Sequence, residues 1–120
     1  SSDVCSSDLP YGTMGGDGQP QTQAQIMTRL NYGMGLAEAI DAPRFALGRT
    51  WGAASTLLAL ENRFDPSIVR ALEKAGHDIF VRAEPYADTF GHAGAIIRYP
   101  KDGRVEAAHD PRADGGALGL

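Results

Sequence analysis

The chain has a single cysteine, no basic cluster and no long hydrophobic run, and each absence excludes a class of protein. Because Cys5 is the only cysteine among 120 residues, no disulfide can form within the chain. Lysine and arginine number 11 against 15 acidic residues, and this net charge of −4 argues against nucleic acid as the main partner. No apolar run is long enough to cross a bilayer, and no signal-like segment opens the sequence. The sequence thus predicts no membrane segment in this chain and leaves its compartment undetermined.

The apolar content is sufficient for one hydrophobic core. Hydrophobic residues make up 42% of the chain, and 120 residues is a typical length for one domain. Residues 1–8 are polar, contain Ser-Ser-Asp twice and show no apolar period. We therefore expect an unstructured leader at residues 1–8, outside the true protein sequence, followed by one folded unit at residues 9–120. With no histidine or other base nearby in sequence, Cys5 is not expected to be a reactive thiol.

The apolar pattern predicts a helix directly after a glycine-rich turn. Four apolar residues are spaced by three and four and would form one face of this helix: Ile26, Met27, Leu30 and Met34. A short strand at residues 9–13 would precede the turn. Asp17 is the expected N-cap, and Pro20 suits the first helical turn because its missing N–H would have no partner there. A further helical turn is expected at residues 36–40, ending before Pro43.

The second half of the sequence predicts one more helix and several strands. Asp65 would cap a helix that starts at Pro66 and ends near Gly76, with a buried stripe of Ile68, Val69 and Leu72. Extended segments are expected at residues 44–47, 56–62 and 79–82, and a hairpin of residues 92–99 and 104–109 around Asp102-Gly103. This order predicts an α/β (α+β) fold, with helices on one face of a mixed, mainly antiparallel sheet. The other face of the sheet would lack a cover.

The stretch GTMGGDG has four glycines within seven positions, and two interpretations are open. It lacks the Gly-Lys-Ser/Thr of a phosphate-binding loop and the G-x-G-x-x-G spacing of a dinucleotide site. The glycines could serve only the geometry of a strand-to-helix turn. Alternatively, bare N–H groups at the start of a helix attract negative charge and would suit the oxyanion that forms in acyl transfer.

Other polar residues favour structural roles. The histidines show no metal-ligand spacing, so no metal site is predicted (His77, His92 and His109). Asp110 is expected to bond to nearby N–H groups in a turn, and Arg112 to pair with a structural carboxylate. Glu38 and Asp41 would lie on a solvated helix face, and Trp51 would be packed within a loop.

Three ordered motifs resemble the C-terminal part of the γ-glutamyltransferase (γ-glutamyltranspeptidase) family. They are GTMGGDGQPQTQAQ, the stretch NYGMGLAEAIDAPRF and the closing AAHDPRADGGALGL, and the resemblance covers residues 9–120. It implies part of the four-layer αββα sandwich of the N-terminal-nucleophile hydrolases. It also implies cleavage of γ-glutamyl or related small amide bonds by a threonine hydroxyl, with the α-amine of that threonine as base and no cofactor. The acyl group would pass to water or to an amine.

The resemblance assigns Gly15 and Gly16 to the oxyanion hole and thus to substrate contact. The nucleophilic threonine of the family lies in a Thr-Thr-His-like segment that does not occur in these 120 residues. Thr13 lies inside the oxyanion-strand motif, where the family has no nucleophile, so we expect a strand-end residue there. The implied partners are a large subunit and the N-terminal part of the small subunit, and the chain alone would be inactive.

One motif departs from the glutathione-processing members of the family. They typically carry a Gly-Ser-Pro-Gly-Gly-Ser-type stretch where this chain has GTMGGDGQPQ. This variant resembles the broader, acylase-like branch, which includes amidohydrolases acting on other small amides. Two alternatives therefore stay open: an amidohydrolase or acylase without transferase activity, and a noncatalytic module that uses the glycine turn to bind an anion.

Overall fold

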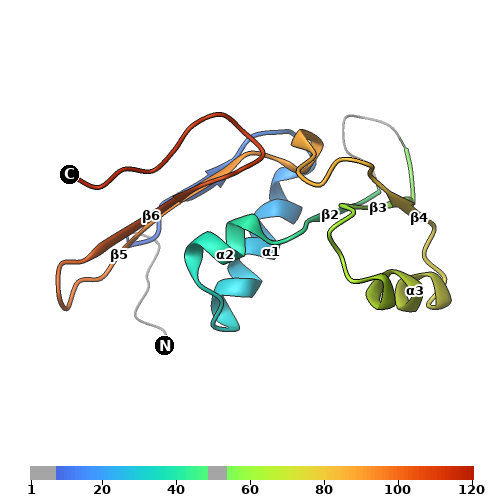
Figure 1. Cartoon of the computed structure of the whole chain (residues 1–120), viewed down its shortest axis with the longest axis horizontal. Helices are drawn as coiled ribbons and strands as arrows, with labels where there is room; N and C mark the ends of the chain where they lie inside the picture. The colour runs from blue at the N-terminus through green and yellow to red at the C-terminus, as the bar shows by residue number, and fades with distance from the viewer. Residues whose placement is uncertain (1–7, 49–53) are drawn as a thin grey trace.

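A computed structural model describes residues 8–48 and 54–120, which form two three-stranded sheets and three α-helices (Figure 1). The elements in chain order are β1 (Tyr11–Thr13), α1 (Gln19–Asn31), α2 (Leu36–Asp41), β2 (Phe45–Leu47), β3 (Leu58–Leu60), α3 (Pro66–Lys74), β4 (Ile79–Val81), the 3-10 helix η1 (Asp88–Phe90), β5 (Ala93–Arg98) and β6 (Val105–His109). The first sheet is antiparallel with strand order β1-β5-β6. The second has the order β2-β3-β4, and its β3 and β4 are parallel. The single sheet expected from the sequence is thus two sheets. Cys5 and Trp51 lie outside the described residues.

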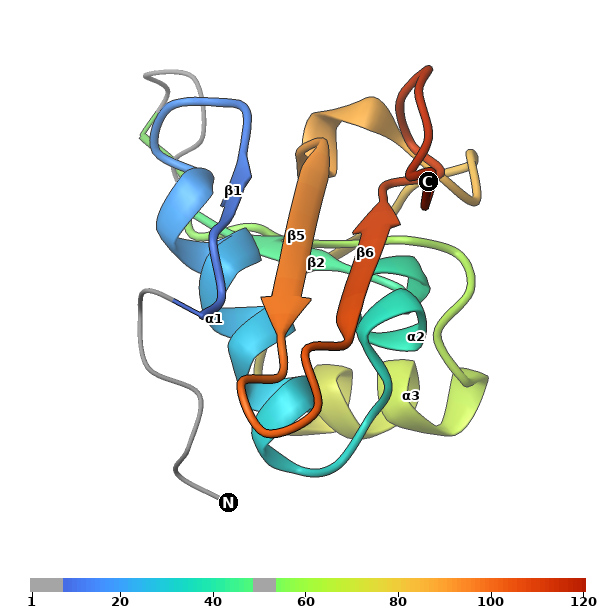
Figure 2. The same cartoon turned by 90° about the vertical axis from the view of Figure 1, so that its left-hand side faces the viewer.

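The core lies between the first sheet and helices α1 and α2. Figure 2 shows β1, β5 and β6 side by side, and Figure 1 shows both helices on one side of them. The buried core residues come from the strands and from both helices: Leu9, Ile26, Leu36, Ala39, Ile40, Ala93, Ala95 and Ile97. The β5–β6 hairpin confirms its prediction, and Gly103 adopts φ +72° in the turn.

The sheet is extended at its first edge by the residues before β1. The backbone carbonyl of Asp8 accepts a hydrogen bond from the Arg98 N–H at 2.8 Å, and its carboxylate lies 2.8 Å from the Arg98 guanidinium. Asp8, which was expected to belong to the unstructured leader, is therefore buried against the fold.

The face of the first sheet away from the helices has little cover. The segment after β6 runs back along this side (Figure 1), and an open groove there is lined by strand residues and by Gly116, Ala117 and Leu118. Tyr11 and Ile96 are exposed. The radius of gyration is 15.5 Å, whereas a compact domain of this length has about 14 Å. The molecule is therefore elongated.

The start of α1 differs from the prediction. Gly18, not Asp17, is the N-cap, and no side chain caps the helix. Pro20 lies in the first turn, as predicted, and α1 ends three residues before Met34. Gly33 ends the helix with φ +91°, a conformation that glycine adopts without steric cost.

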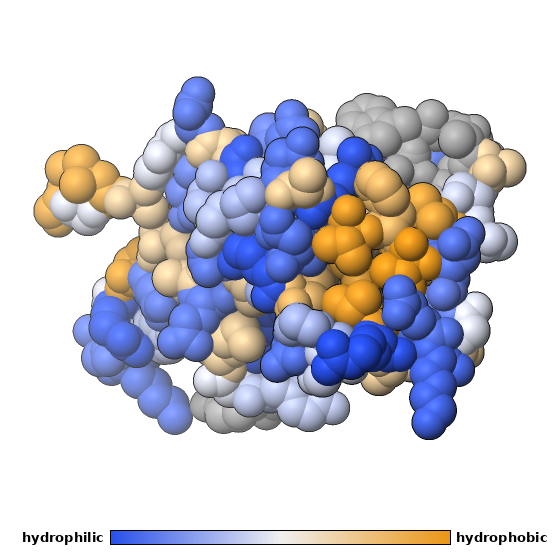
Figure 3. Space-filling view, turned by 45° about the vertical axis from the view of Figure 1, so that its right-hand side comes forward, coloured by the Kyte–Doolittle hydropathy of each residue, from blue (hydrophilic) through white to orange (hydrophobic). Residues whose placement is uncertain are grey.

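Helix α3 confirms its predicted ends but not its buried stripe. Asp65 accepts a hydrogen bond from the Ser67 N–H at 2.8 Å, and Gly76 follows the helix with φ +99°. No residue of α3 is buried, and Ile68 is 46% exposed. The prediction of a buried stripe was wrong because it assumed a layer that would cover the helix. Figure 3 shows apolar side chains gathering on the side of the molecule that carries β3, β4 and α3.

Candidate active site

Gly15 and Gly16 lie in the turn between β1 and α1, at the N-terminal end of the helix. Gly15 has φ +121°, and the Gly16 carbonyl accepts a hydrogen bond from the Gln19 N–H at 3.1 Å. Within the described part of the chain, the N–H groups of Gly15 and Gly16 donate no hydrogen bond. The positive end of the α1 dipole adds to their pull on negative charge. Among the described residues, the turn therefore has two backbone donors without a partner, which is the chemistry that an anionic oxygen requires.

A small cavity of about 20 Å³ lies beside this turn. It is lined by residues of the turn, α1, β2 and η1: Met14, Gly15, Gly16, Asp17, Gly18, Thr22, Phe45, Ala46, Thr89, Phe90 and Gly91. This volume is about enough for one water molecule. A Cβ added to Gly16 would meet no atom within 4 Å, so the space in front of this residue is open.

Thr13 ends β1 and pairs with Ala93 of β5. Its hydroxyl donates a hydrogen bond to the Met14 carbonyl at 3.3 Å. Thr13 therefore has the strand-end position expected from the sequence, and its hydroxyl bonds to the backbone of the next residue.

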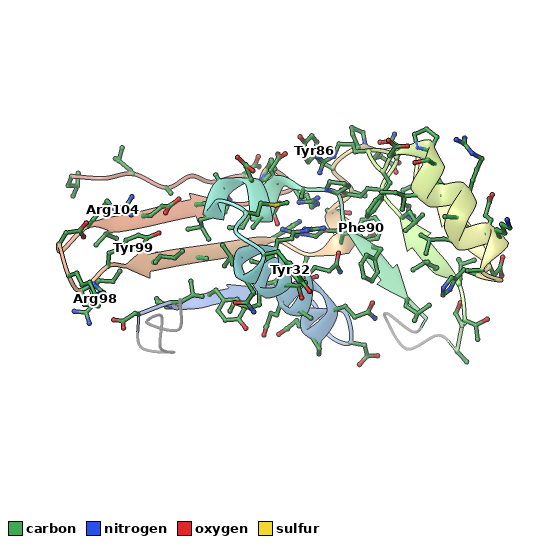
Figure 4. The ribbon with its side chains drawn as sticks, turned by 90° about the horizontal axis from the view of Figure 1, so that it is seen from below. Tyr32, Tyr86, Phe90, Arg98, Tyr99 and Arg104 are labelled. Atoms are coloured by element: carbon green, nitrogen blue, oxygen red, sulfur yellow. The ribbon has the colours of Figure 1, made fainter. Side chains whose placement is uncertain are left out.

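The segment around η1 supports the glycine turn from behind. Thr22 of α1 donates a hydrogen bond from its hydroxyl to the Phe90 carbonyl at 3.1 Å. The Met14 N–H donates to the His92 carbonyl at 3.3 Å. In Figure 4, Phe90 lies where the two sheets meet. Both ends of the glycine turn are therefore held by residues 90–92.

A buried ionic cluster of Arg44, Glu61, Asp110 and Arg112 joins the two sheets. Arg44 lies 2.6 Å from Asp110, and Arg112 lies 2.5 Å from Glu61 and 3.0 Å from Asp110. All four side chains have 0% exposure. The two cations and two anions balance, and Arg63 at the edge of the cluster lies a further 3.0 Å from Glu61. Most of their remaining polar atoms bond to backbone groups, whereas the buried Nε of Arg44 has no hydrogen-bond partner among the described residues. The predicted turn bond of Asp110 and the carboxylate partner of Arg112 are both confirmed.

The cluster also fixes residues behind the candidate site. Arg44 donates hydrogen bonds to the carbonyls of Phe90 at 3.2 Å and Gly91 at 3.0 Å. Burial, together with the nearby charge of Arg112, lowers the pKa of Arg44 to about 10, so it stays charged at neutral pH. Burial alone would raise the pKa of Asp110. The N–H groups of Ala93 and Arg112 and the two guanidinium charges outweigh this and hold that pKa below its usual value.

Asp41 differs in part from its predicted role as a solvated residue. Its carboxylate accepts a hydrogen bond from the Tyr86 hydroxyl at 3.1 Å and lies 3.5 Å from Arg63. The Arg63 guanidinium stacks 3.9 Å from the centre of the Tyr86 ring. Asp41 is exposed yet belongs to this surface cluster, whereas Glu38 is exposed as predicted.

Two glutamines of α1 bind the free edge of β2. Gln25 accepts from the Phe45 N–H at 3.1 Å and donates to the Phe45 carbonyl at 2.9 Å. Gln21 does the same with Leu47, at 2.7 and 2.9 Å. Their spacing of four on the helix matches a spacing of two on the strand. The helix behind the glycine turn is thus fastened to the second sheet as well as to the first.

Neither a metal centre nor a spanning helix is found among the described residues. No group of three or more His, Cys, Asp or Glu side chains in residues 8–48 and 54–120 could hold a metal ion. No helix in these ranges is long and apolar enough to cross a membrane.

The glycine turn could be predicted from the sequence, whereas most of the residues that hold it in place could not. The missed residues are those of the cluster and of the contacts behind the turn: Arg44, Glu61, Thr22, Gly91, Gln21 and Gln25. The only local signal was a charged residue at the end of an apolar strand, as with Glu61 after β3. Such a buried charge needs a partner, but the identity of the partner depends on how the strands are arranged in the fold, and the pattern of one sequence does not show that arrangement.

Residues 5–120 match the sequence profile of the family described as Gamma-glutamyltranspeptidase. The chain is 52% identical over 112 residues to the oxamate amidohydrolase proenzyme of Klebsiella pneumoniae. The alignment covers 92% of this chain and 21% of that protein. It is 42% identical over 121 residues to the glutathione hydrolase-like YwrD proenzyme of Bacillus subtilis, in an alignment that covers 98% of this chain and 23% of that protein. The chain thus spans about a fifth of the length of these curated relatives.

Solved structures agree with this likeness. The crystal structure of cephalosporin acylase from Bacillus halodurans matches with a TM-score of 0.77 and 32% identity, over 90% of this chain and 19% of that chain. The structural neighbours are N-terminal-nucleophile hydrolases, which confirms the predicted fold class. The profile match covers nearly the whole sequence, and two proenzymes share more than two fifths of their aligned residues with it. The chain belongs to the γ-glutamyltranspeptidase family.

Proposed function

We propose that this chain is the C-terminal part of a proenzyme that cleaves a small amide bond and passes the acyl group to water. The carrying observation is that the N–H groups of Gly15 and Gly16, which line a small cavity at the start of α1, have no acceptor among residues 8–48 and 54–120. Such donors stabilise the oxyanion of acyl transfer, because that charge develops as the tetrahedral intermediate forms. The rest of the machinery would come from the large subunit and from the N-terminal part of the small subunit.

The reaction needs a nucleophile from outside this chain. A threonine hydroxyl would attack the amide carbon while its α-amine takes the proton, and the leaving nitrogen departs as a protonated amine or ammonia. Water then attacks the resulting ester, which releases a carboxylate and restores the threonine. The oxygen of the carbonyl would be negative in both tetrahedral intermediates and would accept hydrogen bonds from Gly15 and Gly16.

Hydrolysis of a small amide is favoured over γ-glutamyl transfer. The glycine turn departs from the motif of glutathione-processing members, and the relative with 52% identity is an oxamate amidohydrolase proenzyme. The relative with 42% identity is glutathione hydrolase-like, so hydrolysis or transfer of γ-glutamyl groups is the second candidate. A place in glutathione metabolism belongs to that second candidate.

Kinetics of the complete protein with Gly16→Ala test the oxyanion role. Gly16 is the better choice for substitution, because Gly15 has φ +121° and any side chain there would be strained. Alanine keeps the N–H, but its methyl group would occupy the open space through which the oxyanion approaches, so we expect kcat to fall by on the order of 10²–10³-fold, the usual effect of losing one oxyanion contact. Gly12→Ala is the matched control, as its Cβ also meets no atom within 4 Å.

Two substrates distinguish the candidates. Ammonia release from oxamate and amine release from a γ-glutamyl anilide, each with and without an added dipeptide acceptor, separate hydrolysis from transfer. If Gly16→Ala matures normally and keeps kcat within a few-fold, the turn serves only the geometry of the chain.

A further inference from the structure

Gly91 lies against the back of the glycine turn, where no side chain fits. It follows η1 with φ +88° and is buried. A Cβ added there would lie 2.5 Å from Thr13 Oγ1, 3.2 Å from Thr22 Oγ1 and 3.5 Å from the Met14 carbonyl oxygen. Thr13 and Thr22 are β-branched and stiff about χ1, so they would not turn aside easily. An added methyl group would therefore push on the end of β1 and the first turns of α1.

Gly91 is also fixed from its other side. Its carbonyl accepts a hydrogen bond from Arg44 at 3.0 Å, and Arg44 is held by Asp110 at 2.6 Å. The next residue, His92, accepts the Met14 N–H at 3.3 Å. The segment cannot retreat from the turn without disturbing the buried cluster, so a strain at residue 91 would pass to Met14 and to the glycine that follows it.

We propose that Gly91 is a positioning residue that sets the direction of the Gly15 and Gly16 N–H groups. The proposal rests on the oxyanion role of these glycines given under the proposed function. Without a side chain, Gly91 lets the end of β1, the start of α1 and the segment held by Arg44 meet at one point. The developing charge is bound only in the transition state, so a displaced turn should lower kcat more than it raises KM.

The test compares Gly91→Ala with Gly76→Ala in the complete protein. Gly76 has φ +99° and no atom within 4 Å of an added Cβ, so its substitution brings the same backbone strain without contact to the turn. We expect both variants to lose thermal stability. Only Gly91→Ala should lose kcat, by about 10²-fold, with KM changed by less than about three-fold. Adding Thr13→Ala removes the nearest obstacle and should restore part of the lost kcat.

A second pair of variants covers the case in which Gly91→Ala does not fold. Thr13→Val places a methyl group where the hydroxyl faces Gly91 and should lower kcat, whereas Thr13→Ser keeps the hydroxyl and should not. The proposal is overturned if Gly91→Ala matures with unchanged kcat, if Gly76→Ala loses as much, or if the two Thr13 variants behave alike. If Gly16→Ala lowers kcat but Gly91→Ala does not, the oxyanion assignment stands and only this proposal fails. If Gly16→Ala keeps kcat, the oxyanion assignment itself is at fault.

Discussion

The Arg44 guanidinium lies 2.6 Å from the Asp110 carboxylate, and neither side chain is reached by solvent. Arg44 directly precedes β2 of the second sheet, and Asp110 directly follows β6 of the first. The pair therefore joins the two sheets through charges that water cannot screen. A buried ion left without its partner is far more costly than the intact pair, which makes this contact sensitive to single substitutions.

Asp110→Asn should destabilise the protein by about 3–5 kcal/mol, because it leaves an uncompensated buried guanidinium. Asp102→Asn is the control: Asp102 lies 4.0 Å from Arg104 with both side chains exposed, and such pairs contribute about 0–1 kcal/mol. Urea unfolding of the complete protein measures both variants. Equal losses would show that the buried pair does not carry the stability assigned to it.

The same carboxylate should make stability depend on pH below about 4, the usual carboxyl range. The pKa of Asp110 is lowered in the folded state, so the unfolded chain binds a proton first as the pH falls. Its contribution is complete above the unfolded pKa and is lost as the pH drops through the folded one. Urea unfolding at pH 5 and pH 3 should show a smaller acid loss in Asp110→Asn than in the unchanged protein. If both proteins lose the same stability between pH 5 and pH 3, Asp110 is not the source of the pH dependence.

Gln25→Ala should cost about 1–3 kcal/mol, because it leaves the Phe45 N–H and carbonyl without their partners in a part-buried place. Gln21→Ala should cost less, since its bonds to Leu47 are exposed and water can replace them. Gln23→Ala, on the same helix, is the control. Measured by thermal or urea unfolding, the loss of stability should be largest for Gln25→Ala, smaller for Gln21→Ala and smallest for Gln23→Ala. Any other order contradicts the role of the bonds to the β2 edge.

The isolated chain should show no amidase or transferase activity. Its N–H donors stabilise a charge but cannot begin acyl transfer without a nucleophile. Purified chain is incubated with oxamate and with a γ-glutamyl anilide while ammonia and amine release are followed. Turnover that disappears in Thr13→Ala would identify Thr13 as a nucleophile and refute its assignment as a strand-end residue.

The isolated chain should also associate in solution. Its exposed apolar residues include Ile68 of α3 and Phe80 and Val81 of β4, and an uncovered sheet with free edges favours pairing between chains. Size-exclusion chromatography and binding of a hydrophobic dye measure this. A stable monomer with a cooperative melt would contradict the expectation.

Local features of the fold could be predicted from the sequence, because their causes lie within a few residues. The Asp65 cap, the end of α3 at Gly76 and the Asp102-Gly103 hairpin turn each depend on one side chain or one backbone conformation. Asp17 failed as a cap although its residue type was suitable, because the chain enters α1 one residue later, at Gly18. Because glycines flank Asp17, the backbone could enter the helix at more than one residue.

Long-range features could not be predicted in the same way. The division into two sheets arises because β5 pairs with β1 and not with β4, the strand that precedes it in sequence. The apolar spacing of a strand does not show which other strand it pairs with. The sequence predicted that Arg112 would have a carboxylate partner, but the choice of Glu61, 51 positions away, follows from the packed fold. No sequence pattern marked Gly91 as important, because a side chain there is excluded by Thr13, which lies far away in sequence on another strand.

The reach of Arg112 also sets an order of events during synthesis. Its guanidinium bonds to the Ile40 carbonyl, 72 positions earlier, and to Glu61. Until the ribosome has released residues 110–112, Arg44 lacks Asp110 and Glu61 lacks Arg112, so the second sheet is without the buried ion pairs that join it to the first. A newly made chain must therefore keep β2–β4 soluble until the segment after β6 has been translated, and chaperones or premature aggregation would act on it during this interval.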